Sequence, residues 1–155
     1  MNRVIKFRGK SLVDIGNIKK GDWVYGGIVY DTDRVWIDMP YYEQILVDKE
    51  TVGQYTGLHD KYGKEIYEGD IVTGIDYPFI DEGKQNYVGI VVFYDNVAQF
   101  GYEYKCIRKD KRGISNGVNN EFKANKNLIC EDLEVIGNEY DNPELVGGED
   151  EKSDG

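Results

Sequence analysis

No stretch of this chain keeps an apolar repeat of 3.6 residues over three helical turns, whereas period-two alternation recurs in several segments. Among its 155 residues are 19 glycines and 13 tyrosines. β-Branched and aromatic residues favour pleated strands, glycine favours turns, and the good helix formers are scarce here. The pattern therefore predicts a mainly β fold with very little helix.

Two β-hairpins are predicted from paired runs of this kind. Residues 23–30 and 35–38 flank a turn-forming Asp-Thr-Asp-Arg segment, and Gly26-Gly27 indicates a bulge or bend inside the first run. The second hairpin joins residues 87–94 to residues 98–104.

Shorter elements are expected around these hairpins. Short strands are predicted at 70–73 and 133–136, with a turn at residues 60–64 that joins two short extended pieces. Helix is expected only near Asn127–Glu131 or after Pro143. Lys-Gly-Asp before Trp23 resembles Glu-Gly-Asp before Ile71, which either an internal duplication or a common turn type would explain.

The charge is uneven along the chain. There are 19 Lys and Arg against 29 Asp and Glu, a formal charge of −10. Residues 105–126, named here the basic stretch, hold seven basic and two acidic residues. Residues 147–155 are acidic and lack a large apolar side chain, so we expect a disordered, solvating tail there.

Composition also bears on location. No apolar run approaches the roughly 20 residues that a membrane-spanning helix needs, and the charged N-terminus does not resemble a signal peptide. Two cysteines, Cys106 and Cys130, cannot form a disulfide framework. We therefore expect a cytoplasmic protein that does not contact membranes.

Residues suited to catalysis or metal binding are few. His59 is the only histidine, which excludes sites built from several histidines, and the two cysteines are expected to pack in the core. Glu65, Glu68 and Asp70 could seat a divalent cation or an acid–base pair, or could be turn residues beside Gly69. We expect no enzymatic activity, no cofactor and no metal site.

Two sets of residues could bind macromolecules. Within the basic stretch, nucleic acid could be contacted by Arg108, Lys109, Lys111 and Arg112, with Tyr102 and Tyr104 nearby to stack on bases. The charge of −10 opposes binding of a polyanion, and a solvated loop is the alternative. Tyrosine combines a large contact area with few rotatable bonds, so a protein interface is predicted for Tyr41, Tyr42, Tyr55, Tyr62 and Tyr67.

The segment Glu50–Val72, with its Gly-Gln-Tyr-Thr-Gly-Leu-His-Asp-Lys-Tyr-Gly-Lys core, resembles the signature of the YopX family of phage and prophage proteins. Ile5-Lys6-Phe7-Arg8 is similar to the family's opening element, and residues 133–138 and 142–145 are similar to its closing elements. The resemblance implies a β-rich fold whose second half is an SH3-like barrel. It also suggests self-assembly, and it brings no assigned activity or cofactor.

Together these observations predict three parts. Residues 1–65 form an N-terminal β-hairpin element, residues 66–146 an SH3-like barrel or roll with a mobile basic loop at 108–126, and residues 147–155 the acidic tail. We expect a non-enzymatic phage or prophage accessory protein in the cytoplasm of a bacterial host. It would act through protein association as a homo-oligomer, or with another phage or host protein. The alternative is a small β-barrel that binds nucleic acid through the basic stretch.

Overall fold

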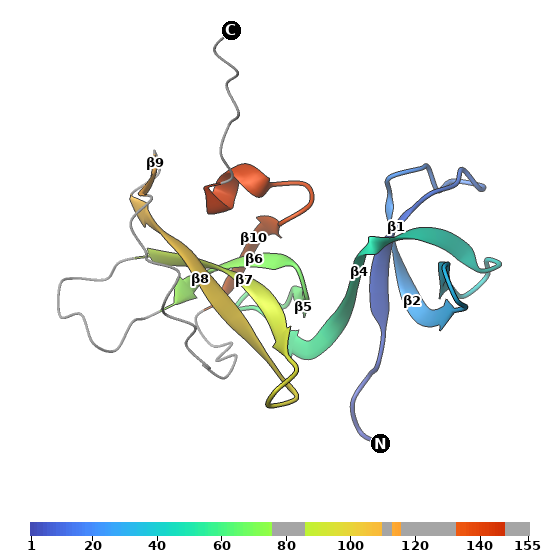
Figure 1. The fold of residues 1–155 in the computed structure, drawn as a ribbon, viewed down its shortest axis with the longest axis horizontal. Helices are drawn as coiled ribbons and strands as arrows, with labels where there is room; N and C mark the ends of the chain where they lie inside the picture. Colours follow the sequence, from blue (N-terminus) through green and yellow to red (C-terminus); the bar gives the residue numbers. More distant parts are fainter. Residues whose placement is uncertain (76–85, 110–112, 116–132, 148–155) are drawn as a thin grey trace, which may run out of the picture. The chain divides into compact units, whose positions relative to one another are not determined.

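The computed structural model describes residues 1–75, 86–109, 113–115 and 133–147. Over these ranges the protein is mainly β with two antiparallel sheets, which confirms the predicted fold class. The chain divides into two compact units, Met1–Leu58 and His59–Gly155 (Figure 1). The boundary expected between residues 65 and 66 therefore falls inside the second unit.

The first sheet closes on itself. It consists of β1 (Phe7–Ser11), β2 (Trp23–Tyr30), β3 (Val35–Asp38), β4 (Ile45–His59) and β5 (Glu65–Tyr67). The strand order is β1-β2-β3-β4-β5, and β1 pairs with β4 as well as with β2. The first four strands therefore form a ring, of which the sequence predicted only the hairpin of β2 and β3.

The ring depends on a change of partner within β2. Residues 23–26 pair with β1, whereas residues 27–30 pair with β3, without a register shift in either set. Gly26-Gly27 therefore marks a change of partner and not a bulge. An ideal Cβ at Gly26 would lie 2.0 Å from the backbone oxygen of Asp38. Only a residue without a side chain allows this approach.

The long strand β4 carries an irregularity that hides it from sequence patterns. Arg8 of β1 pairs with Gly53, but Lys10 pairs with Asp48, so residues 49–52 bulge out of the ladder. The hydroxyl of Thr51 donates to the backbone oxygen of Asp48 (2.7 Å) and accepts from the N–H of Lys10 (2.9 Å). Thr51 thus satisfies backbone groups that the bulge takes out of register.

The interior of the ring is aliphatic. Alternate residues of the strands point inward, as period two requires, and the buried cluster consists of Ile18, Val24, Ile37, Ile45 and Val47. On the opposite side of β1, Lys6 lies over the ring of Tyr55 (5.1 Å), and Arg8 lies over that of Trp23 (4.6 Å). Arg8 and Tyr55 are both buried.

The second sheet lies in the second unit. It consists of β6 (Asp70–Ile75), β7 (Asn86–Tyr94), β8 (Gln99–Lys109), β9 (Gly113–Ser115) and β10 (Glu134–Asn138), in the order β10-β6-β7-β8-β9. The long hairpin of β7 and β8 confirms the second predicted hairpin (Figure 1). Its core includes Ile71, Val88 and Ile90. The SH3-like interpretation of this half stays a prediction.

Two further expectations concern the ends of this unit. The basic loop expected to start at Arg108 instead begins with the end of β8 and includes β9, which pairs with it through Arg108 and Ile114. The short 3-10 helix η2 (Pro143–Val146) confirms the helical turn predicted after Pro143. The rest of the basic loop, the Asn127–Glu131 helix and the acidic tail from residue 148 lie outside the described residues. Among the described residues, no helix is long and apolar enough to cross a membrane.

The two Gly-Asp segments share one local geometry. Gly21 and Gly69 both have positive φ, 92° and 83°, and lie two residues before β2 and one residue before β6, respectively. The carboxylate of Asp22 accepts from the N–H of Lys19 (2.9 Å), and that of Asp70 accepts from the N–H of Tyr67 (2.8 Å). In both segments, the aspartate carboxylate thus accepts a hydrogen bond from the backbone N–H three residues earlier. This bond closes the turn that precedes the strand.

Gly26→Ala should lower the free energy of unfolding by about 1–3 kcal/mol, because the new methyl group forces the Asp38 carbonyl aside. Gly27→Ala is the matched control, since its Cβ would meet no atom closer than 3.9 Å. This control should raise the free energy of unfolding by about 0.4–1 kcal/mol through the unfolded state. Urea unfolding followed by tryptophan fluorescence measures both. Equal effects of the two substitutions would contradict the close approach at Gly26.

Candidate interaction surface

The connection between β3 and β4 presents two tyrosines on a tight turn, residues 39–42, named here the Tyr41 turn. The N–H of Tyr42 donates to the backbone oxygen of Met39 (3.2 Å). Pro40 follows Met39, and Tyr41 has φ of 69°. This is the pattern of a type II turn, in which the third position requires positive φ and normally holds glycine. A bulky residue there costs about 1–2 kcal/mol, so Tyr41 is held in an unfavourable conformation.

Tyr41 is fully exposed in this conformation, and Tyr42 is 38% exposed. Tyr42 is not isolated, because an ideal Cβ at Gly16 would lie 3.5 Å from its ring. In the Tyr41 turn, the ring of Tyr41 is therefore exposed to solvent, and the ring of Tyr42 lies close to the loop that contains Gly16. Backbone strain together with a displayed aromatic side chain is typical of positions with a binding role.

Beside this turn the surface has an open hollow of about 450 Å³ lined by Trp36, Asp38, Glu43 and Gln44, named here the Trp36 hollow. Its composition follows from the strand pattern. Ile37 and Ile45 are buried in the ring, so Trp36 and Asp38 point to the opposite face of β3, and Glu43 and Gln44 immediately precede β4. The hollow thus combines an aromatic ring, two carboxylates and an amide.

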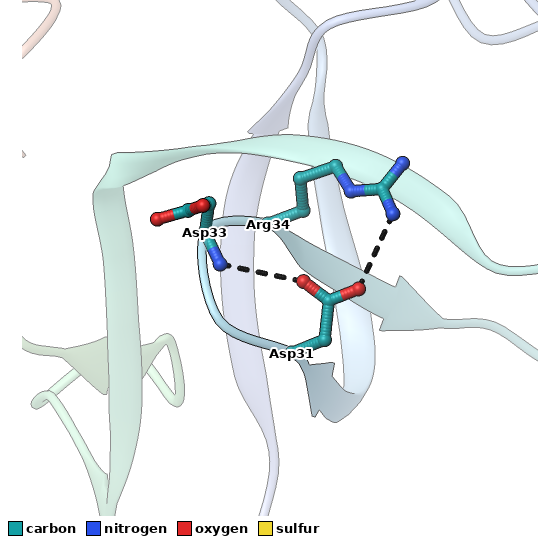
Figure 2. A network of polar contacts seen from close by, with 3 residues as sticks. All are labelled: Asp31, Asp33 and Arg34. Atoms are coloured by element: carbon teal, nitrogen blue, oxygen red, sulfur yellow. Dashed lines mark hydrogen bonds and ion pairs between the residues drawn. The ribbon is translucent and has the colours of Figure 1, made fainter.

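A cation from the same chain already lies against Trp36. The guanidinium carbon of Arg34 is 5.0 Å from the centre of the Trp36 ring, and the same group pairs with Asp31 at 3.3 Å. Figure 2 shows the Asp31 carboxylate between Arg34 and the backbone N–H of Asp33, which donates to it at 3.3 Å. This hydrogen bond, followed by the charge of Arg34, lowers the pKa of Asp31 despite partial desolvation. The exposed ion pair adds little stability, but it keeps Arg34 above the ring.

The five tyrosines predicted as interface residues occupy different environments. Tyr41, Tyr42 and Tyr62 are exposed, with Tyr62 on the turn after β4. Tyr55 and Tyr67 are buried, with 6% and 2% of their surface exposed, because they lie on strands and face packed neighbours. Tyr41 and Tyr42 share one turn, the Tyr41 turn.

The four basic residues predicted to contact nucleic acid are only partly described. The backbones of Arg108 and Lys109 lie in β8, paired with Ile114 and Gly113 of β9. Lys111 and Arg112 lie outside the described residues. The nucleic-acid interpretation therefore stays a prediction.

The carboxylates considered for metal or acid–base chemistry take part in local hydrogen bonds. Glu65 accepts from the hydroxyl of Tyr67 (2.8 Å), and the buried Asp70 accepts from the backbone N–H of Tyr67. In the described part of the chain, no three His, Cys, Asp or Glu residues are grouped as a metal site would need. His59 ends β4 and is exposed; Cys106 lies in β8, and Cys130 falls outside the described residues.

Asp60 has a structural role that the sequence pattern did not reveal. One carboxylate oxygen accepts from the N–H groups of Tyr62 and Lys64, both at 2.9 Å, and the other accepts from the N–H of Val135 in β10 at 3.0 Å. A single side chain therefore holds a turn closed and joins it to a strand 75 residues later. The sequence predicted the turn from Asp60 and Gly63, but contains no signal for its distant partner.

The Trp36 hollow was also missed by the sequence analysis. Proline followed by two aromatic residues and a glutamate, between two predicted extended runs, is the signal that could have drawn attention to it. From the sequence, Trp36 and Asp38 are predicted only as residues of the strand at 35–38.

Comparison with known protein families gives one match. A family model described as YopX protein matches residues 8–147, a range that includes both sheets, except Phe7 of β1, and the Tyr41 turn. No match to the chain is found among curated proteins.

Asp60→Asn should lower the free energy of unfolding by about 1–3 kcal/mol at neutral pH, because an amide cannot accept from all three N–H groups. Asp95→Asn, an exposed residue in the hairpin of the same unit, is the control and should change it by less than about 0.5 kcal/mol. Urea unfolding at pH 7 compares the two. A loss no larger than that of the control would contradict the role of Asp60.

The stability of the chain should also depend on pH through Asp60. Burial by itself raises the pKa of this carboxyl, but the N–H groups of Val135, Lys64 and Tyr62 outweigh it, so its pKa lies below the ordinary value of 3.8. A lowered folded-state pKa gives stability that is complete above the unfolded pKa and lost as the pH falls through the folded pKa. Between pH 5 and pH 2, the wild type should therefore lose more stability than Asp60→Asn does. Parallel curves for the two proteins would refute this.

Proposed function

The chain belongs to the YopX family, and on that premise we propose that it is a non-enzymatic accessory protein of a phage or prophage that acts through protein association. In this proposal it works in the cytoplasm of a bacterial host and forms homo-oligomers. Its principal contact surface is the Tyr41 turn with the neighbouring Trp36 hollow.

The observation that supports this proposal most strongly is the partition of charge and apolar surface between the units. Residues 1–58 contain eight basic and eight acidic residues, so the formal charge of −10 falls entirely on residues 59–155, which contain 11 and 21. A neutral surface lacks the repulsion that keeps copies apart. The first unit also exposes most of the large apolar side chains found exposed in the described residues.

The Tyr41 turn supports the same proposal. A fully exposed tyrosine in an unfavourable backbone conformation gains nothing inside a monomer. Tyrosine is enriched at protein interfaces because its ring adds contact area at a small entropic cost. Association through this turn would bury that ring and offset the strain.

Light scattering after size exclusion should give a mass above the 17.8 kDa of one chain at concentrations of about 10–100 μM. Tyr41→Asn should raise the dissociation constant about tenfold, because tyrosine anchors often contribute more than 1 kcal/mol. Asparagine tolerates positive φ, so the turn itself should persist.

Tyr30→Asn is the matched control for this prediction, since Tyr30 is an exposed tyrosine of the same unit outside the turn. It should leave the measured mass unchanged. A purely monomeric wild type would remove self-association from the proposal. If both substitutions raise the dissociation constant of the oligomer equally, the Tyr41 turn is not its contact surface.

A further inference from the structure

The Trp36 hollow has the features of a receptor for a positively charged side chain. An aromatic face attracts cations through its quadrupole, and Trp is the strongest of the three rings. Asp38 and Glu43, both exposed, line the same hollow as Trp36. Arg34, whose guanidinium carbon is 5.0 Å from the ring centre, shows that this ring already packs against a cation.

The charge of the surrounding segment favours the same ligand. Residues 31–44 contain four acidic residues and one basic residue, and that single base is paired with Asp31. The segment thus carries a net charge of −3, although the unit as a whole is neutral. Asp38 and Glu43 line the hollow itself, and Asp31 and Asp33 lie in the turn between β2 and β3. Negative charge of this kind favours the approach of a cation.

We propose that the Trp36 hollow receives a Lys or Arg side chain from the basic stretch, residues 105–126, of a second copy of this chain. This inference rests on the proposed self-association and adds the chemistry of the contact. The two segments are complementary in charge, because the basic stretch contains seven basic and two acidic residues and residues 31–44 carry a net charge of −3. A contact between two different surfaces is heterologous, so it builds a ring or an extending chain of copies.

The first experiment neutralises the hollow without changing its shape. Asp38→Asn combined with Glu43→Gln should raise the dissociation constant of the oligomer at least tenfold, measured by light scattering at about 50 mM salt. The control combines Glu50→Gln with Asp95→Asn, which removes the same charge from exposed positions that lie outside residues 31–44 and do not line the hollow. The control should leave the dissociation constant within about twofold. Raising the salt to about 500 mM should weaken the wild type and abolish the difference.

The second experiment reverses charge on both sides of the contact. One variant carries Asp38→Lys and Glu43→Lys; the other carries Arg108→Glu, Lys109→Glu, Lys111→Glu and Arg112→Glu. Each variant alone should be monomeric, and an equimolar mixture should regain the mass of an oligomer. Circular dichroism establishes that each variant retains its β signal.

The outcomes separate this inference from the proposed function. A monomeric wild type would overturn both. An oligomer that tolerates both hollow variants would overturn the inference alone. If both charge-reversed variants are monomeric and an equimolar mixture does not regain the mass of an oligomer, the inference is also overturned. Binding of the basic stretch to the Trp36 hollow of the same chain, with no change in mass, would overturn it as well. Salt-dependent binding of labelled single-stranded DNA that is lost in the Arg108–Arg112 variant would assign the basic stretch to nucleic acid instead.

Discussion

The close approach between Gly26 and the carbonyl of Asp38 determines the form of the first unit. It lets β2 leave β1 and pair with β3 in one continuous strand, and β4 then returns to pair with β1. Closure removes the free edges of these four strands, through which sheets otherwise aggregate. The same approach fixes the end of β3, from which the Tyr41 turn and the Trp36 hollow begin.

The sequence predicted those strands whose alternation is uninterrupted. Both hairpins were located to within a few residues, because their apolar runs end in clear turn residues. Of β4 the sequence predicts only a short extended piece before the turn at residues 60–64, because the polar bulge at residues 49–52 breaks its pattern, although Thr51 restores the hydrogen bonds. Ring closure could not be predicted, since pairing between β1 and β4 depends on tertiary contacts that no local pattern encodes. For the same reason the sequence predicts an interface of five tyrosines, of which Tyr41 and Tyr42 belong to the candidate site, and does not predict the neighbouring tryptophan and carboxylates.

The segment that resembles the YopX signature, Glu50–Val72, has mainly a structural role. Within Glu50–Val72, Asp60 and Asp70 accept backbone hydrogen bonds, and Gly63 and Gly69 adopt positive φ. The segment therefore contributes turns and hydrogen bonds to the fold. The Tyr41 turn precedes it in the chain and lies in the first unit, whereas the segment continues from the first unit into the second.

The hydrogen bond from Val135 to Asp60 has a consequence for biosynthesis. All pairings of the four-stranded ring lie within the first 58 residues, whereas Asp60 meets its partner only after 75 more residues have been made. Domains generally fold in order as they leave the ribosome. We therefore expect the neutral unit to emerge and close first, with the Tyr41 turn already formed on the nascent polypeptide while the acidic unit is still being translated.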